Sequence, residues 1–405
     1  MEAEIVHVED LSDSVIDEDH QIMELLDGAM ESPELVLLFP TTQEAGEDGF
    51  GDKVEILNSE LDCPLVGVSV GGFATHETDG LNTRGVAAVL LRDLDFKLHR
   101  FEDVWHADRE EGRDAMEEPG TTLCLVSGGW GPSDTTMKFW SHISDYSSKV
   151  LGMNMLGKRD DILEDFRQKL KDHRIGYHDL WEERIEALLS GCDVQNFNSG
   201  DMGDFSEGYE ISGDEVTEGR SGVLVELEED LEAGTAGGPE LAFENGRVLE
   251  SFDEIQSSRH VAYGFDGDSL TDLKEKHPIQ RDIGRGNFMY YFIFETDGHS
   301  FSVPINADLD MLVSYLPLED LDGAHLARAP SFSSYMESFR DMLEDLDGVV
   351  HFSLNPPQVV SFQGKLSEIV SESQDRLDEF ILTTDNGMRD ARSFDYNFPG
   401  YLRYD

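Results

Sequence analysis

The sequence predicts an α/β N-terminal domain with an internal pseudo-duplication, followed by an α+β C-terminal domain rich in hairpins. Three observations lead to this fold class. Short apolar runs alternate with a helical stretch in the first half, part of that half recurs further along, and turn signals fill the second half. We expect an acidic lead-in over residues 1–33, the α/β domain over 34–231 and the C-terminal domain over 232–405.

The α/β prediction begins with four apolar runs, each of the length of a buried strand. They are LVLLFP at 35–40, LVGVSV at 65–70, VAAVLL at 86–91 and TLCLV at 122–126. A helical stretch over 54–61 separates the first two. Because strand, helix and strand in this order are typical of parallel pairing through a crossover, we expect a sheet with both faces covered. Helical spacing of apolar residues predicts a helical insertion over about 134–183.

Two segments of the predicted α/β domain resemble each other. RGVAAVLLRDL, from Arg84 to Leu94, is similar to RSGVLVELEEDL, from Arg220 to Leu231. Each follows a strand, a Gly-rich turn and a polar stretch, which read VGVSVGGFATHETDG and VQNFNSGDMGDFSEG. The similarity indicates an internal duplication with extra helix in the second copy. Chance similarity of Gly-Val-Leu runs is the alternative.

Turn signals dominate the second half. An Asn-Gly pair at 245–246 and Thr-Asp-Gly at 296–298 predict hairpins, and Asn-Pro-Pro at 355–357 predicts a wider turn. Helices are expected over 333–346 and 364–381. The aromatic tail SFDYNFPGYLRYD is expected to pack on a sheet, since so many rings are costly to leave in water.

Acidic residues are spread over the whole chain. There are 86 Asp and Glu against 30 Lys and Arg, which gives a formal net charge of −56, while hydrophobic residues make up 39%. That apolar fraction is enough for a packed core, so the charge does not indicate disorder. Molar salt shortens the Debye length to about 3 Å, so surface carboxylates then repel one another little. The composition is therefore typical of a halophile.

The charge also bears on partners and location. No basic stripe is present to neutralise phosphates, so nucleic acid is not expected as a partner, and anionic membranes are disfavoured for the same reason. The first residues, MEAEIVHVED, lack an export signal, and no apolar run is long enough to span a membrane. We expect a cytoplasmic protein.

Neither a metal site nor a cofactor is predicted. Cys63, Cys124 and Cys192 lie far apart without ligand spacing, so buried thiols are expected. Histidines 260, 277 and 299 also lack ligand spacing. No phosphate-binding loop and no zinc-protease motif occurs.

Gly67-Val68-Ser69-Val70-Gly71 fits the G-x-S-x-G pattern of a nucleophile elbow. An elbow requires a helix directly after the serine, so that backbone N–H groups hold the oxyanion. The sequence that follows, GFATHETDG, is a poor first helical turn. His76 in this stretch is expected to be a solvated loop histidine. We therefore predict no catalytic residue and expect a protein that is not an enzyme, with a serine hydrolase built on Ser69 as the alternative.

Two glycine-based motifs resemble those of FIST domains, a family of intracellular sensory modules. That family carries a strand ending in G-C-S-T-x-G and, later, a helix leading into a G-G-x-A-G-D-like turn. The stretch 67–72 stands at the first motif, and 198–204 resembles the second. The likeness covers residues 35–130 and 184–231. Departures include Val68 in place of the usual cysteine, and Asn198 with Ser199 in place of the glycine pair.

The resemblance implies a non-catalytic domain that binds a small ligand, such as an amino acid or a related metabolite, and passes the signal to a protein partner. Two Gly-rich turns at the ends of neighbouring strands would meet in one crevice, where glycines let the backbone approach a ligand closely. The expected ligand-binding residues are Ser69, Gly71, Gly72, Thr75, Asn198, Gly200, Asp201 and Gly203. Alternatively the glycines only relieve tight turns, and a ligand-free structural or assembly protein is the third function left open.

Overall fold

The computed structural model describes about half of the chain. The described residues are 1–9, 32–101, 120–126, 150–155, 208–218, 222–235, 240–243, 261–262, 264–265, 268–269, 272, 275, 288–296, 299–306, 312–313, 325–328, 332–354, 366–384, 386–390, 393–395 and 400–404. This part is a mixed, sheet-rich structure with few helices, about 50% strand and 25% helix.

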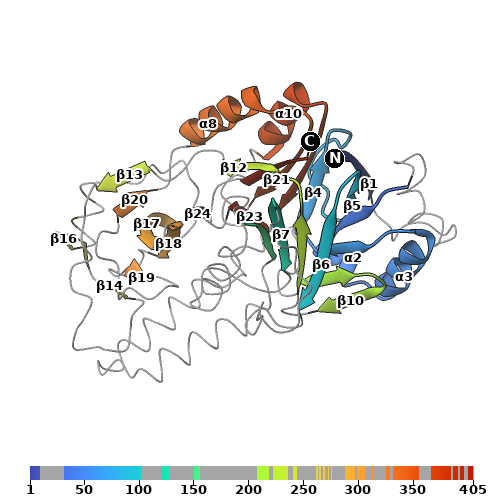
Figure 1. Cartoon of the computed structure of the whole chain (residues 1–405). Helices are drawn as coiled ribbons and strands as arrows, with labels where there is room; N and C mark the ends of the chain where they lie inside the picture. The colour runs from blue at the N-terminus through green and yellow to red at the C-terminus, as the bar shows by residue number, and fades with distance from the viewer. Residues whose placement is uncertain are drawn as a thin grey trace, which may run out of the picture.

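Within the described residues the strands form three larger sheets (Figure 1). The first contains, in order across the sheet, β1 (Glu2–Glu9), β5 (Gly85–Arg92), β2 (Leu35–Pro40), β3 (Leu65–Val68), β9 (Tyr209–Ser212) and β10 (Glu215–Glu218). The third contains β12 (Glu232–Thr235), β25 (Gly400–Tyr404), β21 (Val349–Leu354), β22 (Glu379–Thr384) and β4 (Gly72–Thr75).

The second sheet is the widest. It begins with β6 (Phe96–Phe101), β11 (Gly222–Leu227), β7 (Thr121–Val126), β8 (Val150–Met155), β23 (Asn386–Asp390) and β24 (Ser393–Asp395). It continues through β18 (His299–Asn306), β17 (Phe288–Thr296), β20 (His325–Arg328) and β13 (Glu240–Phe243). The short strands β14 (Val261–Ala262) and β19 (Leu312–Val313) join it at β18, while β15 (Gly264–Phe265) pairs with β16 (Asp268–Ser269).

All three sheets share one strand pattern. An outer strand (β1, β6 or β12) pairs antiparallel with a return strand (β5, β11 or β25), which pairs antiparallel with a first strand (β2, β7 or β21). The first strand is parallel to a second strand (β3, β8 or β22). The second strand pairs antiparallel with a fifth strand (β9, β23 or β4). We refer to β1–β5, β6–β11 and β12–β25 as the first, second and third repeats.

The fifth strand of this pattern comes from a different repeat in each sheet. In the chain β4 follows β3, yet it completes the third sheet by pairing with β22. The second repeat supplies β9 to the first sheet, and the third repeat supplies β23 to the second sheet. The exchange at this position is therefore cyclic, because every repeat gives its strand to the sheet of another repeat and receives a strand in return. We call β4, β9 and β23 the exchanged strands.

The pairing register repeats together with the strand order. The exchanged strands end at Thr75, Ser212 and Asp390, which pair with Ile381, Val66 and Leu151. Those three residues pair in turn with His351, Leu37 and Leu123 of the first strands. Positions in the three sheets can therefore be matched residue by residue.

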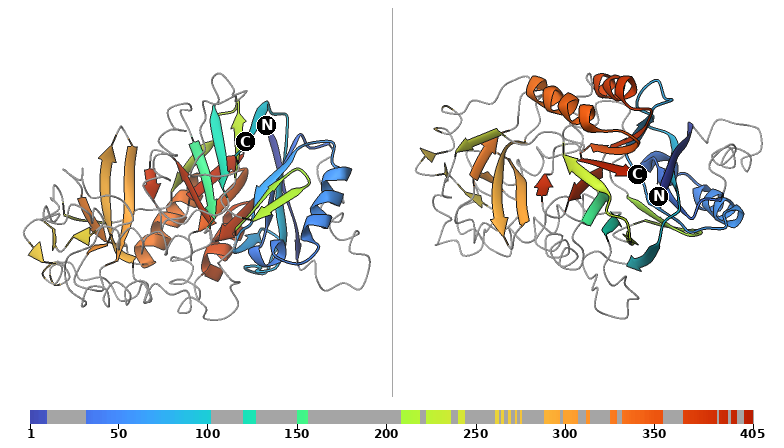
Figure 2. Two further views of the ribbon diagram at one scale, coloured as in Figure 1. Left: turned by 90° about the horizontal axis from the view of Figure 1, so that it is seen from below. Right: turned by 45° about the horizontal axis from the view of Figure 1, so that its top comes forward.

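A common apolar core lies between the sheets. Alternation along β2 sends Leu35, Leu37 and Phe39 into it, together with residues of β7, β11, β22 and β25. Val36 and Leu38 face the other way and pack with α3 (Phe50–Glu60), which α2 (Thr42–Ala45) precedes. The third sheet is covered likewise by α8 (Phe332–Asp345) and α10 (Leu366–Arg376) (Figures 1 and 2). The two chain ends lie side by side in all views.

Several sequence predictions are confirmed. β2 and β3 are parallel and are joined through α3, and their residues are buried on both faces. The hairpin around 296–298 is formed by β17 and β18, and α8 matches the expected helix. In the aromatic tail, Leu402 and Tyr404 of β25 are buried in the common core. The turns at 245–246 and 355–357 lie outside the described residues.

Four stretches differ from expectation. The helix expected over 364–381 ends at Arg376, because the stretch from Phe380 is rich in aromatic and β-branched residues and pairs on both sides as β22. Val150–Met155, inside the expected helical insertion, is strand β8, paired with β7. Residues 72–75, expected in a loop, form β4. Part of the acidic lead-in, Glu2–Glu9, is an outer strand.

The two similar segments of the predicted α/β domain lie at matching places. They contain β5 and β11, which are the return strands of the first and second sheets. This is the relation that a duplication predicts, and β25 holds the same place in the third sheet. The domain boundary after residue 231 stays a prediction. Two of the sheets contain strands from both sides of it.

Gly67 provides a test of the close strand packing in the first sheet. A Cβ atom at this position would lie 1.9 Å from the carbonyl oxygen of Leu38. We expect Gly67→Ala to lower the free energy of unfolding by about 1–3 kcal/mol through overpacking. Gly51→Ala in α3 is the control, because a Cβ there meets nothing within 4 Å, and it should raise stability by about 0.5–1 kcal/mol. Denaturant unfolding in molar KCl measures both, and equal effects would contradict the packing argument.

Candidate functional site

Ser69 lies where the chain leaves the first sheet for the third. Its side chain is fully buried, and its Oγ accepts a hydrogen bond of 2.9 Å from the backbone N–H of Tyr209. The N–H of Ser69 donates to the carbonyl of Tyr209, also at 2.9 Å. Tyr209 is the first residue of the exchanged strand β9. Ser69 therefore fastens that strand to the end of β3.

Thr384 holds the matching position in the third sheet. It stands three residues after Ile381, as Ser69 stands three residues after Val66. The Oγ1 of Thr384 donates to the carbonyl of Gly72, the first residue of the exchanged strand β4, at 3.3 Å. In both sheets a hydroxyl at the end of the second strand thus binds the start of an exchanged strand.

The surroundings of Ser69 do not form a nucleophile elbow. Strand β4, not a helix, follows the serine after a short connection. The backbone N–H groups that would hold an oxyanion are already engaged, since Val70 donates to Pro40 at 2.8 Å and Gly71 donates to Thr384 at 2.9 Å. The geometry gives the serine hydrolase alternative no support.

The glycines near Ser69 accommodate neighbouring backbone. A Cβ on Gly72 would lie 2.8 Å from the carbonyl oxygen of Asn82, and Gly67 is closed off by Leu38. The space beside these two glycines is filled by protein, as the tight-turn alternative requires. Ligand binding by Ser69, Gly71 and Gly72 stays a prediction. Asn198, Gly200, Asp201 and Gly203 lie outside the described residues, so their convergence with Ser69 stays a prediction too.

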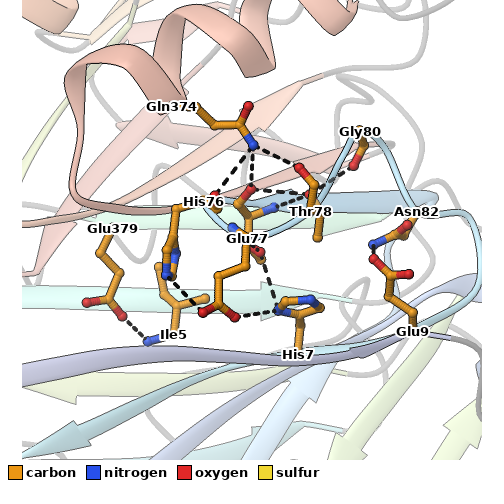
Figure 3. Close-up of polar contacts among 11 residues, drawn as sticks. Ile5, His7, Glu9, His76, Glu77, Thr78, Gly80, Asn82, Gln374 and Glu379 are labelled. Carbon is orange, nitrogen blue, oxygen red and sulfur yellow. Dashed lines mark hydrogen bonds and ion pairs between the residues drawn. The ribbon is translucent and has the colours of Figure 1, made fainter.

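Thr75, the fourth predicted residue in the described part, leads to a different group of side chains (Figure 3). Its Oγ1 lies 3.3 Å from Nδ1 of His7 and accepts a hydrogen bond of 3.3 Å from the N–H of Glu77. The Glu77 carboxylate lies between two imidazoles, 4.0 Å from Nδ1 of His7 and 3.9 Å from Nε2 of His76. We call His7, Thr75, His76, Glu77 and Glu379 the His–Glu face.

The His–Glu face is partly open to solvent. The Glu77 side chain is 68% exposed, against 27% for His76 and 14% for His7. Burial lowers the pKa of His7, although Glu77 and Glu9 act to raise it and His76 adds to the lowering. Burial likewise raises the pKa of Glu379, against the hydrogen bond that its Oε1 accepts from the N–H of Ile5. The face therefore presents a neutral imidazole beside an accessible carboxylate at neutral pH.

Two other parts of the chain, together with bonds inside the loop, hold the loop that carries His76 and Glu77. Gln374 of α10 donates through Nε2 to the carbonyl of Thr78 at 2.8 Å. Asn82 donates to Oε1 of Glu9 in β1 at 3.0 Å. Inside the loop, Thr78 Oγ1 accepts from the N–H of Thr75 at 3.0 Å and donates to the carbonyl of Gly80 at 2.9 Å. The loop is thereby fixed between β1 and α10 (Figure 3).

This loop is longer than its counterpart in the second repeat. Phe73, two residues before the end of β4, pairs with Asn82, so eight residues (74–81) lie between them. The matching residue of β9, Glu210, pairs with Thr217, and six residues (211–216) lie between. The two additional residues belong to the loop that contains His76 and Glu77. The His–Glu face is thus a feature of one repeat, not a requirement of the repeated fold.

The described residues give little support for a metal site, a reactive cysteine or a membrane-spanning helix. No group of three or more His, Cys, Asp or Glu side chains among them is arranged to hold a metal ion. Burial, with a contribution from Asp62, raises the pKa of the Cys63 thiol to about 11, so it is protonated at neutral pH. Among the helices in this part of the chain, none is long and apolar enough to cross a membrane.

Comparison with known proteins adds no assignment. No family model and no curated protein matches this chain. The resemblance to FIST domains therefore stays a prediction from the sequence. Function has to be inferred from the residues themselves.

Sequence reasoning missed most of the His–Glu face. His76 was expected to be solvated, but most of its side chain is covered. Nothing in the sequence indicates that His7 of β1 and Glu379 of β22 approach the loop after β4, because that contact depends on the strand exchange. The expanded loop is recognisable once the repeats are aligned, and that alignment requires the pairing register.

We predict that Ser69 is structural. Ser69→Ala should lower the free energy of unfolding by about 1–3 kcal/mol, because the buried N–H of Tyr209 loses its acceptor. Ser59→Ala is the control, since the exposed Ser59 hydroxyl bonds only to its own helix at the carbonyl of Ile56, and it should change stability by less than about 0.5 kcal/mol. Denaturant unfolding measures both. Labelling of Ser69 by a fluorophosphonate in the folded protein would contradict the structural role.

Proposed function

We propose that this protein is a non-catalytic sensor that binds a small, amine-bearing, amino-acid-like ligand and passes the signal on by protein–protein contact. The proposed site is the His–Glu face. The observation that carries the proposal is the position of the Glu77 carboxylate, which is exposed and lies about 4 Å from an imidazole nitrogen on either side. The sequence resemblance to sensory modules points in the same direction.

The chemistry of the face suits an ammonium group. An ammonium has three N–H donors and no acceptor, so it needs several acceptors around it. Glu77 offers a carboxylate, and it lies 4.0 Å from Nδ1 of the neutral His7 ring, which is itself hydrogen-bonded to Thr75. The His76 ring nitrogen lies at a similar distance on the other side. A carboxylate elsewhere on the ligand would be placed toward solvent, away from Glu77.

The salt conditions that the composition indicates narrow the ligand class further. At molar ionic strength charges separated by more than about 3 Å hardly interact. A ligand therefore has to contact Glu77 directly to gain from its charge, and it must displace the cations that surround an exposed carboxylate. An amine that forms directional hydrogen bonds to Glu77 meets this requirement.

A bound ligand would connect elements of two repeats. The loop is bonded to β1 through Asn82 and to α10 through Gln374. Movement of Glu77 toward a ligand would change the geometry of both hydrogen bonds. The outer surface of α10 is thus the proposed route to a protein partner. We further propose a cytoplasmic, halophilic protein with an α/β domain over 34–231 and an α+β domain over 232–405, in keeping with the sequence.

The test is a thermal unfolding screen of amino acids and small amines in molar KCl, repeated with Glu77→Gln. A ligand at about 100 times its Kd should stabilise the protein by roughly 2.7 kcal/mol. A hydrogen bond to a charged group contributes about 1.5–3 kcal/mol, so Glu77→Gln should weaken binding by about tenfold or more.

Glu55→Gln provides the matched control, because Glu55 is an exposed carboxylate on α3, away from the loop. It should leave both the stability and the ligand response unchanged. No stabilisation by any compound, or equal loss of binding in the two variants, would overturn the proposed site. In the first case the assembly alternative would gain weight.

A further inference from the structure

Three buried polar side chains form a connected group in the core of the third sheet. Nε2 of His351 lies 2.8 Å from Oγ1 of Thr383, and Nδ1 of His351 lies 3.4 Å from the hydroxyl of Tyr404. All three side chains are almost completely buried. Thr383 also donates to the carbonyl of Phe352 at 3.3 Å. One arrangement satisfies every group, with Tyr404 donating to Nδ1 and Nε2–H donating to Thr383.

The matching positions in the other repeats are apolar. His351 corresponds to Leu37 and Leu123 through the shared register. Thr383, two residues after Ile381, corresponds to Val68 and Met153. Tyr404, two residues after Leu402, corresponds to Leu91 and Leu227. The repeated fold therefore does not need polar groups at these positions, and the third repeat carries all three together.

A chain of three similar repeats has a particular folding hazard. Each sheet presents apolar strands in the same order and register, so a strand of one repeat can dock in the place of its counterpart. Apolar burial hardly distinguishes such alternatives, because it is not directional. A set of side chains that can be satisfied only when the strands of the third sheet pair with one another would remove this ambiguity, and such a set would act as a specificity device.

We infer that His351, Thr383 and Tyr404 act as this device and specify which strands assemble into the third sheet. If β25 docked against β2 or β7, the Tyr404 hydroxyl would face Leu37 or Leu123 and lose its partner in the core. If β22 docked against either strand, Thr383 would lose His351. An unpaired buried polar group is strongly disfavoured, whereas the complete network is tolerated. The best attested use of buried polar groups is such specification of register.

Burial gives the network a second measurable property. It lowers the pKa of His351 to about 3, and the titratable group in contact with the ring, Tyr404, is neutral because burial raises its pKa. Phe39 of β2 packs against the ring from the opposing sheet and carries no charge. The unfolded chain therefore takes up a proton on His351 between about pH 6.5 and pH 3, while the folded protein does not. The contribution of His351 to unfolding is absent above pH 6.5 and grows as the pH falls, by about tenfold in the unfolding constant per pH unit.

The test replaces the network by apolar side chains of similar size in the full-length protein, His351→Leu with Thr383→Val and Tyr404→Phe. We expect this triple variant to be folded and at least as stable as the parent at neutral pH. Below pH 6.5 its unfolding constant should lack the tenfold dependence per pH unit. After denaturation and dilution into molar KCl, its yield of native monomer should fall at least twofold, with misassembled species visible by size exclusion and limited proteolysis.

A control variant alters the same core layer in the first sheet, Leu37→Met with Val68→Ile, and should refold with the parent's yield. A second variant, Tyr404→Phe alone, leaves His351 without its donor and should lose stability. Because β25 then carries no hydroxyl that docking against β2 or β7 would leave unpaired, its refolding yield should also fall, by less than that of the triple variant. The inference fails if the triple variant refolds as well as the parent. It also fails if the triple variant cannot be obtained folded at all, because the network would then be required for stability and not for selection.

Discussion

Reciprocal exchange of strands is the constraint on which the rest of this structure depends. The second strand of each sheet can satisfy its backbone hydrogen bonds only with a strand from another repeat. An unpaired edge in the core would leave buried N–H and C=O groups without partners, which folded proteins avoid. No repeat can therefore close its own sheet, and the common core forms only when all three are present. We expect the fold to be cooperative for this topological reason.

The features of the crossover segments follow from that exchange. At the end of β3 the chain must leave one sheet and enter another within a few residues, so side chains there serve the backbone of the incoming strand. The hydroxyls of Ser69 and Thr384 form hydrogen bonds to the backbone of an exchanged strand. Gly72 has no side chain, so the carbonyl of Asn82 can lie close to it. The G-x-S-x-G pattern, which resembles a catalytic motif, is thus explained by backbone packing and hydrogen bonding at the strand crossover. Gly67 admits the neighbouring strand, Ser69 binds the exchanged strand, and Gly71 donates to Thr384.

Sequence reasoning succeeded where the signal is local. The buried strands Leu35–Pro40 and Leu65–Val68 are apolar on both faces, and the segment between them contains a helix, so their parallel pairing follows from pattern alone. The exchange could not be predicted, because β4 pairs with a strand about 300 residues away. The polar group around His351 was missed for the same reason, since its members lie in three strands that neighbour one another only in the folded sheet. The predicted helix over 364–381 extended too far, because the amphipathic helix α10 ends at Arg376 and the buried strand β22 already begins at Glu379.

One of the few basic residues binds an exchanged strand. The chain has 30 Lys and Arg against 86 acidic residues, yet Arg100 of β6 is placed on Glu210, a fully buried carboxylate of the exchanged strand β9, with their charged atoms 3.0 Å apart. The same guanidinium also bonds Glu215 and Thr217 of β10, so one side chain of the second sheet holds the whole exchanged hairpin of the first. In molar salt exposed pairs are screened, but a pair whose carboxylate is buried keeps most of its interaction. A buried carboxylate that lost its partner would be strongly destabilising. The acidic surface that suits high salt is thus compatible with a fixed interior at this point, because Arg100 stands where strands of the first and second sheets meet.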